Sequence, residues 1–288
     1  MKVRLKRRIA ATAALLSVVG AVSVGAAGSS AAQTTGLRAF GITADGTLMV
    51  VFSTDRPQVL DWVRVVTGLN GDTALIGIDF RVQNGLLYGV GNAGGVYAIT
   101  TPPTTPDVVV KKVSQLSVPL WGNNFDVDFN PAADRLRVIS DQGQNLRHNL
   151  TDGSTTEDAI LTTPPSLGPT RGVTAAAYTN NDLNPDTATT LFDINTATDQ
   201  VVVQSPANNG TLAPTGALGI DAGPNAGLDI YSDLVNGKPV SATAFATLTS
   251  GNSNETALYN VNLLTGAATA VGKFPLGITD IAIALDTN

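Results

Sequence analysis

A short pattern that returns about every fifty residues limits the fold more than any other feature of the sequence. The pattern is an apolar run with one acidic residue inside it, then a polar turn and a second apolar run, and it is clearest over 75–90. At intervals of 49, 49, 52 and 51 residues, the acidic position falls on Asp79, Asp128, Ala177, Asp229 and Asp280. Such a period in short strands separated by turns is typical of a β-propeller. We therefore expect an all-β, five-bladed β-propeller.

The two ends of the chain predict how this ring closes. Strand patterns at 37–43, 47–52 and 62–66 lack an innermost strand before them, whereas 277–285 resembles an innermost strand with nothing after it. The C-terminal strand is expected to join the N-terminal strands in one composite blade, which leaves no free sheet edge. The four complete blades are expected at 75–117, 123–162, 172–215 and 227–274.

The first 32 residues have the pattern of a secretory signal peptide. Five basic residues precede an apolar run over 9–27, and small residues follow as far as Ala32. An uncleaved membrane anchor is the alternative, but the run is diluted by Ala, Gly, Ser and Thr. We favour cleavage after Ala32, which leaves 33–288 as a single propeller domain. The product would be secreted, and either extracellular or associated with the cell envelope.

The net charge and the absence of cysteine limit the classes of partner that the protein can have. Cleavage would remove five of the 17 basic residues and none of the 23 acidic ones, so the mature chain would carry a net charge of −11. An acidic chain of this kind has no electrostatic footprint for nucleic acid or for an anionic membrane. Because the sequence has no cysteine, disulfides and a lipid-anchored lipoprotein are excluded. We expect a monomer without membrane insertion after cleavage, whose partner is a glycan or an extracellular protein.

Several motifs resemble one known family. They are Gly77-Ile78-Asp79-Phe80 and the blocks 124–131, 134–138 and 140–147, with later matches at 176–180, 190–194 and 210–212. The chain resembles, over essentially all of 37–285, the secreted bacterial family described as domain of unknown function 4394. That family has no established activity. The resemblance therefore implies a secreted, repetitive all-β domain and supplies no catalytic residue.

The repeated acid allows two interpretations. Asp79, Asp128, Asp229 and Asp280 could form a ring at the channel mouth that binds a cation such as calcium through oxygen ligands. Alternatively, each accepts hydrogen bonds from backbone amides of the adjoining blade, since a carboxylate buried between blades must find donors. A device present once per blade suits a structural role better than a site, which needs asymmetry. We favour the structural role and expect no other cofactor.

Catalytic chemistry has little support in the sequence, and no catalytic residue is assigned. Glycoside hydrolysis needs two carboxylates, and the only two glutamates after Ala32, Glu157 and Glu255, lie in turn-like contexts. The single histidine, His148, is expected to be an exposed strand residue, and no nucleophile elbow accompanies it. One histidine without cysteine also excludes ordinary zinc and copper sites. A hydrolase of glycans or lactones, acting through channel-mouth carboxylates, is kept as an alternative function.

A binding site is expected where the repeat is broken. Trp121 precedes an innermost strand and could stack on a sugar, and Asn180 and Asp182 lie in a polar insertion, 180–189, beside the missing acid at Ala177. The sequence thus predicts a secreted binding or scaffold protein whose ligand is a glycan, an envelope component or an extracellular protein. A purely structural envelope protein is the third alternative.

A local basic cluster supplies the remaining binding candidates. Arg135 and Arg137 share one face of a predicted strand and could bind a carboxylate or an acidic sugar. The competing interpretation, which we favour, is pairing between blades with nearby acids such as Asp134 and Asp141.

Overall fold

The fold is described by a computed structural model over residues 36–251 and 255–287. The predicted signal peptide lies outside these residues. The described residues belong to one compact unit, Thr35–Asn288, and form strands β1 to β20 and one 3-10 helix, η1 (Ala207–Asn209). Within the described ranges, no helix is long and apolar enough to cross a bilayer. The expected all-β class is therefore observed.

The largest sheet has eight strands and contains both ends of the described chain. Its order is β20-β1-β2-β3-β7-β6-β5-β4. Its N-terminal half consists of β1 (Arg38–Thr43), β2 (Leu48–Ser53) and β3 (Leu60–Thr67), with β20 (Ile278–Ile283). Its other half consists of β4 (Leu75–Arg81), β5 (Leu86–Gly91), β6 (Gly95–Ile99) and β7 (Val108–Gln115). Each half is antiparallel, and a short parallel pairing of β3 with β7 joins the two. The C-terminal strand β20 pairs with β1, with Ala39 opposite Ile283.

Three further sheets have four antiparallel strands each. The first contains β8 (Phe125–Asn130), β9 (Arg135–Ser140), β10 (Asn145–His148) and β11 (Thr155–Glu157). The second contains β12 (Val173–Tyr178), β13 (Leu191–Asn195), β14 (Gln200–Gln204) and β15 (Leu212–Ala217). The third contains β16 (Ala222–Val235), β17 (Lys238–Ser250), β18 (Thr256–Val261) and β19 (Ala268–Lys273).

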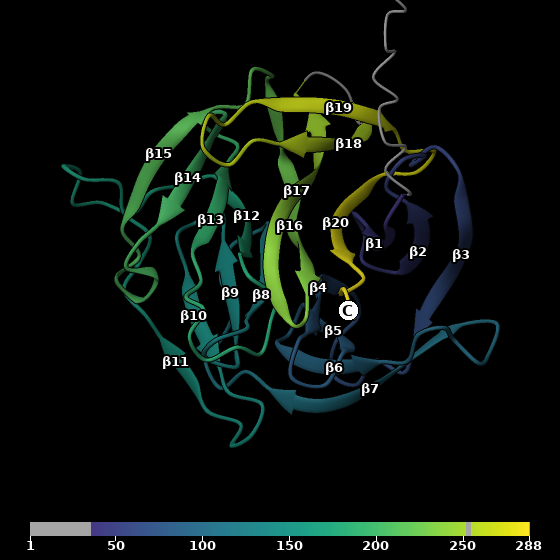
Figure 1. Cartoon of the computed structure of the whole chain (residues 1–288). Coiled ribbons are helices and arrows are strands. Elements are labelled where there is room, and N and C mark those ends of the chain that lie inside the picture. The colour runs from purple at the N-terminus through teal and green to yellow at the C-terminus, as the bar shows by residue number, and fades with distance from the viewer. Residues whose placement is uncertain (1–35, 252–254, 288) are drawn as a thin grey trace, which may run out of the picture. The chain divides into compact units, whose positions relative to one another are not determined.

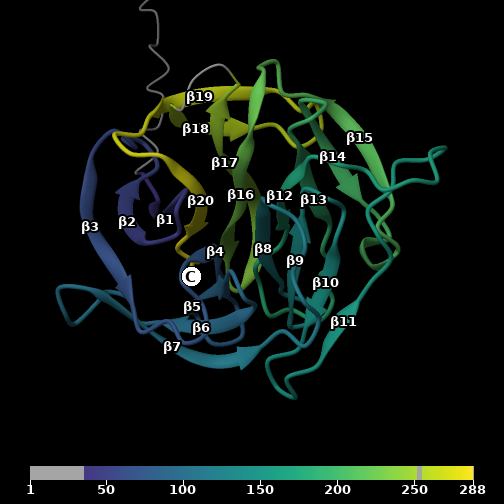
Figure 2. The same cartoon turned by 180° about the vertical axis from the view of Figure 1, so that it is seen from behind.

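The first strand of each repeat lies at the centre of this unit. Figure 1 and, from behind, Figure 2 show β4, β8, β12, β16 and β20 inside, with β3, β7, β11, β15 and β19 at the periphery. The inner strands contact one another in a closed cycle from β4 through β8, β12 and β16 to β20 and back to β4. This arrangement of sheets is propeller-like.

The apolar core is divided among the gaps between successive sheets. Five clusters of buried side chains fill these gaps, and each combines residues of two neighbouring sheet segments. In one of them, Phe40 of β1 packs edge-to-face against Phe80 of β4, with ring centroids 5.5 Å apart. Because both faces of a sheet are covered in this way, inner strands such as β12 are buried at every residue. Apolar runs without strict alternation follow from this packing.

One hairpin extends beyond the others. Strands β16 and β17 have 14 and 13 residues, and the turn that joins them contains Asn236 and Gly237, both with positive φ (54° and 71°). Two successive residues with positive φ are what a tight hairpin turn of this hand requires, and Asn-Gly is a favoured sequence for it. The turn places this tip beside the cavity described below.

Candidate functional site

Five buried aspartates occupy the centre of the unit. Four are the repeated acids Asp79, Asp128, Asp229 and Asp280, and the fifth is Asp126, two residues before Asp128 on the same face of β8. All five are at least 94% buried. They are carried by β4, β8, β16 and β20, whereas β12 has Ala177 at the equivalent position.

The repeated acids connect neighbouring inner strands through main-chain bonds. Asp79 accepts the N–H of Phe129 on β8 (2.7 Å), and Asp128 accepts that of Tyr178 on β12 (3.1 Å). In the same way, β16 is bonded to β20 through Asp229 and Ile283 (2.5 Å), and β20 to β4 through Asp280 and Ile78 (2.6 Å). These bonds give the carboxyl groups the donors that buried polar groups need.

Asp126 joins β12 and β16, the pair of inner strands that has Ala177 in place of the repeated acid. Its Oδ2 accepts the N–H of Ala176 on β12 (2.7 Å) and that of Leu228 on β16 (3.3 Å). Its carboxyl also shares a hydrogen bond with that of Asp280. Asp126 is not among the residues predicted from the sequence, although a second acid two positions from Asp128 in an otherwise apolar strand is a signal for it.

The carboxyl groups of Asp79, Asp128 and Asp229 converge. One oxygen of each lies within 4.8 Å of the others, a spacing that would suit oxygen ligands of a cation. Burial, followed by the charge of neighbouring acids, raises the pKa of Asp79 and Asp128 well above its usual range, and burial raises the pKa of Asp229 and Asp280 to about 7. These shifts favour the protonated form of the carboxyl groups, and main-chain N–H groups donate to their oxygens.

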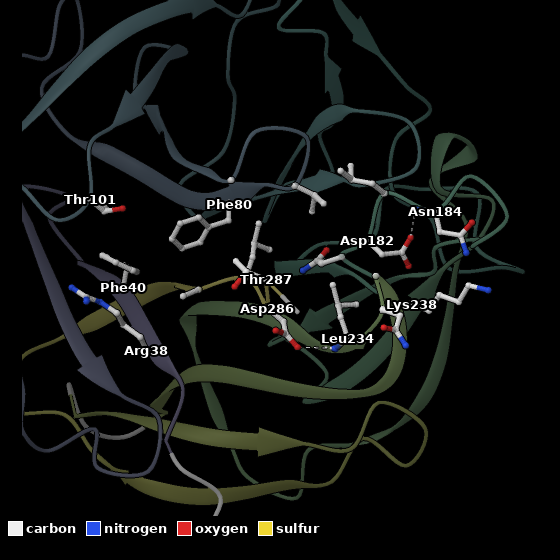
Figure 3. A pocket seen from close by; sticks show the side chains of 18 of the residues that line it. Arg38, Phe40, Phe80, Thr101, Asp182, Asn184, Leu234, Lys238, Asp286 and Thr287 are labelled. Atoms are coloured by element: carbon white, nitrogen blue, oxygen red, sulfur yellow. Dashed lines mark hydrogen bonds between the residues drawn. The ribbon is translucent and has the colours of Figure 1, made fainter.

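A cavity of about 700 Å³ lies where the inner strands end. Its walls come from segments far apart in the sequence: 38–40, 80–85, 101–102, 181–184, 234–238 and 284–287. Phe40, Phe80 and Leu285 supply apolar surface, and the charged residues on the lining are Arg38, Asp182, Lys238 and Asp286. Figure 3 shows Arg38 and Phe40 at one end of this cavity and Asp182 at the other. We call it the mouth cavity.

A second, smaller cavity of about 80 Å³ lies at the opposite ends of the inner strands. Asp280 lines it, together with polar residues such as Asn124, which precedes β8, and Asn225, which lies near the start of β16. The other four central aspartates line neither of these two cavities. Asp79, Asp126, Asp128 and Asp229 therefore lie away from both cavities, and Asp280 alone borders one of them.

The predicted binding residues are not brought together. Trp121 is 41% exposed and precedes β8, near the residues 123–125 that line the smaller cavity. Arg135 donates to the carbonyl oxygens of Ala133 and Asp134 in its own turn. Asp182 lines the mouth cavity, whereas Asn180 donates its amide to the Ala188 carbonyl oxygen across the insertion. Among the five candidates, only Asp182 lines the mouth cavity.

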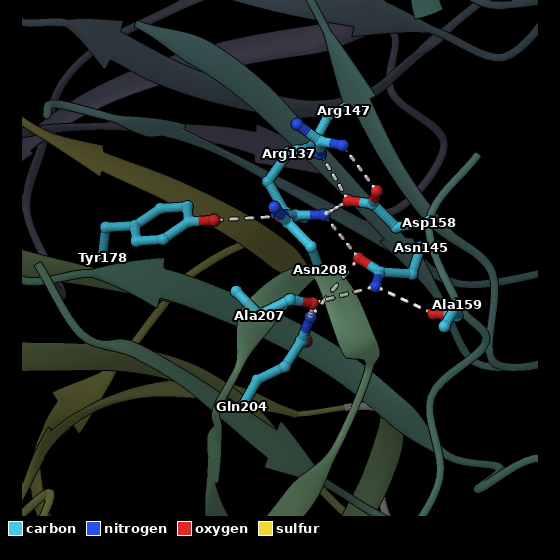
Figure 4. A network of polar contacts seen from close by, with 9 residues as sticks. All are labelled: Arg137, Asn145, Arg147, Asp158, Ala159, Tyr178, Gln204, Ala207 and Asn208. Carbon is cyan, nitrogen blue, oxygen red and sulfur yellow. Dashed lines mark hydrogen bonds and ion pairs between the residues drawn. The ribbon is translucent and has the colours of Figure 1, made fainter. Parts of the chain in front are cut away.

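Arg137 lies inside a polar network between two sheets. Its guanidinium is 2% exposed and donates to Asp158 (2.7 Å), to the Asn145 side chain (2.7 Å) and to the Tyr178 hydroxyl (3.1 Å), as Figure 4 shows. Arg147 donates to the same Asp158 carboxylate (2.6 Å). Arg137 therefore pairs with Asp158 rather than with Asp134 or Asp141, and Arg135 forms no ion pair among the described residues.

A further buried acid near Arg137, Asp193, is not among the residues predicted from the sequence. Asp193 on β13 is fully buried, and neither carboxyl oxygen has a hydrogen-bond partner among the described residues. Burial raises the pKa of Asp193 well above its usual range, and the nearby charge of Arg137 opposes that shift. A protonated carboxyl at this place avoids an unpaired buried charge.

His148 corrects a prediction. It is fully buried rather than exposed, because β10 is covered on that side: Nε2 lies 2.7 Å from Ser114 Oγ and Nδ1 lies 3.0 Å from Thr155 Oγ1. Burial lowers the pKa of His148, which favours the neutral ring. Neither His148 nor Ser114 lines one of the two cavities. The two glutamates, Glu157 and Glu255, line neither of them either.

The sequence matches the family described as domain of unknown function (DUF4394) over residues 48–284. The chain belongs to this family. The expected resemblance is thereby confirmed, and the uncharacterised DUF4394 family brings no assigned activity. No curated protein matches the chain.

Solved structures similar to this DUF4394 chain share little sequence with it. The WD40 domain of Toxoplasma gondii coronin has 12% identity and a TM-score of 0.41, and the match covers 83% of this chain and 57% of the coronin chain. A protein of unknown function from Bacteroides thetaiotaomicron has 14% identity and a TM-score of 0.44, covering 88% and 68% of the two chains. The glutaminyl cyclase of Myxococcus xanthus has 13% identity and a TM-score of 0.43, covering 74% and 90%.

Proposed function

We propose that this chain is a secreted binding protein that holds its ligand in the mouth cavity. The observation that carries this proposal is the cavity itself. Ligand sites in proteins usually enclose about 300–1,000 Å³ and combine mostly apolar walls with a few polar groups. The mouth cavity, at about 700 Å³, has this size and this composition. A glycan unit, a part of an envelope component or a segment of an extracellular protein would fit such a space.

We also infer that the unit is a five-bladed propeller. Five antiparallel four-strand segments and the closed cycle of inner strands support this number of blades. Composite closure through β20 is supported by its pairing with β1. A ring of this kind collects several loops around each end, which explains how six distant segments can build one cavity.

The proposal places the protein outside the cytoplasm. It rests on the basic start, the apolar run and the small residues before position 33, which are typical of an export signal. The absence of cysteine from the sequence suits an exported domain that is stabilised by its core alone. Cleavage after Ala32 is tested by N-terminal sequencing of the protein recovered from the culture medium.

Ligand binding in the mouth cavity is tested with a variant that fills it. Ala284 is small, half-buried and part of the cavity wall, so Ala284→Trp should occupy the space with little effect on the core. Ala132→Trp is a matched control, because Ala132 is exposed and lies outside the cavity. A library of sugars, amines, carboxylates and short peptides is screened by ligand-observed NMR.

We expect compounds that bind the wild-type protein and Ala132→Trp but bind Ala284→Trp at least tenfold more weakly. The proposal is wrong if every compound that binds the wild-type protein binds Ala284→Trp equally well.

A further inference from the structure

Asp182 lines the mouth cavity, and one of its carboxyl oxygens has no hydrogen-bond partner among the described residues. The residue is 5% exposed, and its Oδ1 accepts the N–H of Asn184 at 2.6 Å. Its Oδ2 is buried and has no hydrogen-bond partner among the described residues. A buried acceptor left without a donor costs about 1–3 kcal/mol, and more when it is charged. The position is therefore unfavourable unless something outside the chain supplies the donor.

The loop that carries Asp182 is fixed in place. The neighbouring Asn181 is bonded to β16 twice, since its N–H donates to Ser232 Oγ (3.0 Å) and its side-chain amide donates to the carbonyl oxygen of Ile230 (3.2 Å). The N–H of Asp182 itself donates to the Asn180 carbonyl oxygen (2.7 Å). These bonds hold the carboxylate in the cavity wall instead of allowing it to turn outward. A rigid, preorganised acceptor of this kind is suited to recognition.

No described basic residue neutralises this carboxylate. Within the described part of the chain, the ion pairs involve other acids, and none includes Asp182. Arg38 lines the other end of the cavity, where its guanidinium lies 5.4 Å from the centre of the Phe40 ring. Lys238 lies at the exposed tip of the β16–β17 hairpin. Asp182 therefore has no ion-pair partner among the described residues, and a cationic ligand could supply one.

The rest of the cavity suits the apolar part of such a ligand. Phe40 and Phe80 form an edge-to-face pair with an interplanar angle of 68°, and Leu285 lies on the same lining. Aromatic rings also attract organic cations through their π faces. A bare metal ion fits less well, because calcium takes six to eight oxygen ligands and Asp182 offers one free oxygen.

We propose that Asp182 binds the ammonium or guanidinium group of an amphipathic organic cation whose apolar part lies against Phe40, Phe80 and Leu285. This inference rests on the proposed function, since it names the class of ligand that the mouth cavity takes. A neutral hydroxyl could donate a hydrogen bond to the carboxyl group, but it could not form an ion pair with it. A cation does both, and charge-assisted hydrogen bonds are about twice as strong as neutral ones.

Three probes of the same shape test the charge preference. Phenylbutylamine carries the cation, phenylbutanol replaces it with a neutral hydroxyl, and phenylbutanoate replaces it with an anion. Their affinities for the wild-type protein are measured by titration calorimetry or NMR. We expect phenylbutylamine to bind at least tenfold more tightly than phenylbutanol, and phenylbutanoate to bind most weakly.

Two matched variants assign this preference to one residue. Asp182→Asn keeps the Oδ1 acceptor for Asn184 and removes the charge, whereas Asp186→Asn removes the same charge from an exposed residue of the same loop. We expect Asp182→Asn to reduce the affinity for phenylbutylamine at least tenfold, to that of phenylbutanol. Asp186→Asn should leave all affinities unchanged.

Stability supplies a readout that does not depend on a ligand. If Asp182 serves a ligand, Asp182→Asn loses no bond within the protein, so its urea midpoint without ligand should be no lower than that of Asp186→Asn. A clearly lower midpoint for Asp182→Asn alone would assign Asp182 to the scaffold and overturn the inference.

The binding results separate this inference from the proposed function. If the three probes bind equally well, or if Asp182→Asn keeps the preference for the amine, the cation inference is wrong, while binding that Ala284→Trp abolishes still supports a ligand site. If none of the three probes binds the wild-type protein, the cation inference is also wrong. The proposed function then stands or falls with the broader library.

Discussion

At the scale of single residues, Arg137 has the largest structural role among the sequence-predicted candidates. Its side chain extends from β9 and donates to Tyr178 on β12 and to Asn208 in η1 (2.8 Å), so one guanidinium joins two sheets. The side chain of Asp158 is 5% exposed, and its carboxylate balances the charge of Arg137. Pairs that are this well buried contribute little net stability compared with apolar residues, but removing one partner leaves the other groups unpaired.

We predict that Arg137→Met lowers the free energy of unfolding by about 3–5 kcal/mol, because several buried acceptors lose their donor. Arg135→Met removes the same charge at a position two residues away. The hydrogen bonds of the Arg135 side chain go to main-chain oxygens of its own turn. Arg135→Met should change stability by less than about 0.5 kcal/mol. Urea unfolding followed by circular dichroism measures both. Equal losses in the two variants would contradict the prediction.

The sequence could place these arginines on one strand face but could not separate their roles. Arg135 and Arg137 alternate with apolar residues in β9, which predicts a common face for both. Which of the two is buried depends on Asp158 and Asn208, which are 21 and 71 residues away from Arg137. Asp182 shows the same limit, because its free oxygen follows from a loop conformation and from contacts with β16.

At the scale of elements, the repeat predicted the inner strands well. The repeated positions Asp79, Asp128, Ala177, Asp229 and Asp280 fall on the five inner strands β4, β8, β12, β16 and β20. Local signals suffice for this, because each strand is a short apolar run bounded by turn residues. The mouth cavity needed tertiary structure, since its wall combines three connections after inner strands, the segment 284–287 after β20 and two further segments. The parallel pairing of β3 with β7 also has no local signal.

The element on which the rest depends is β20. It pairs with β1, contributes buried Ile281 and Ile283, and donates the Ile283 N–H to Asp229. We predict that a chain ending at Gly277 loses cooperative thermal unfolding, because β1 becomes an open edge and Asp280 no longer bonds β4. Near-UV circular dichroism and a thermal scan measure this.

The matched control for that truncation is a chain that lacks only Thr287 and Asn288, which should unfold like the full chain. A cooperative transition with native near-UV signal in the chain ending at Gly277 would show that the closing strand is dispensable.

At the scale of the whole molecule, the central aspartates couple folding to pH. They are carried by four of the inner strands and accept main-chain hydrogen bonds from all five inner strands, so their ionisation affects the entire ring. In the unfolded chain, an aspartate has a pKa of about 3.9. In the folded chain, burial raises the pKa of Asp229 and Asp280 to about 7 and that of Asp79, Asp126 and Asp128 well above its usual range.

The direction of the pH dependence follows from these shifts. Between about pH 4 and pH 7 the folded chain binds more protons than the unfolded chain, so the free energy of unfolding falls as pH rises. One carboxyl that is protonated in the folded chain and ionised in the unfolded chain contributes at most about 1.4 kcal/mol per pH unit. The lowered pKa of buried His148 makes the free energy of unfolding rise with pH, but this is one group, whereas five aspartates act in the other direction.

We predict that the urea midpoint is highest near pH 4 to 5 and decreases steadily toward pH 8. Asp229→Asn, which keeps an acceptor oxygen for Ile283, should make this decrease shallower by about one group, or about 1.4 kcal/mol per pH unit. Asp186→Asn, at an exposed position, should leave the slope unchanged. Urea titrations at each pH measure the three slopes. A midpoint that stays constant or rises between pH 5 and pH 8 would mean that the central carboxyls are ionised in the folded chain, with a bound cation rather than shared protons balancing their charge.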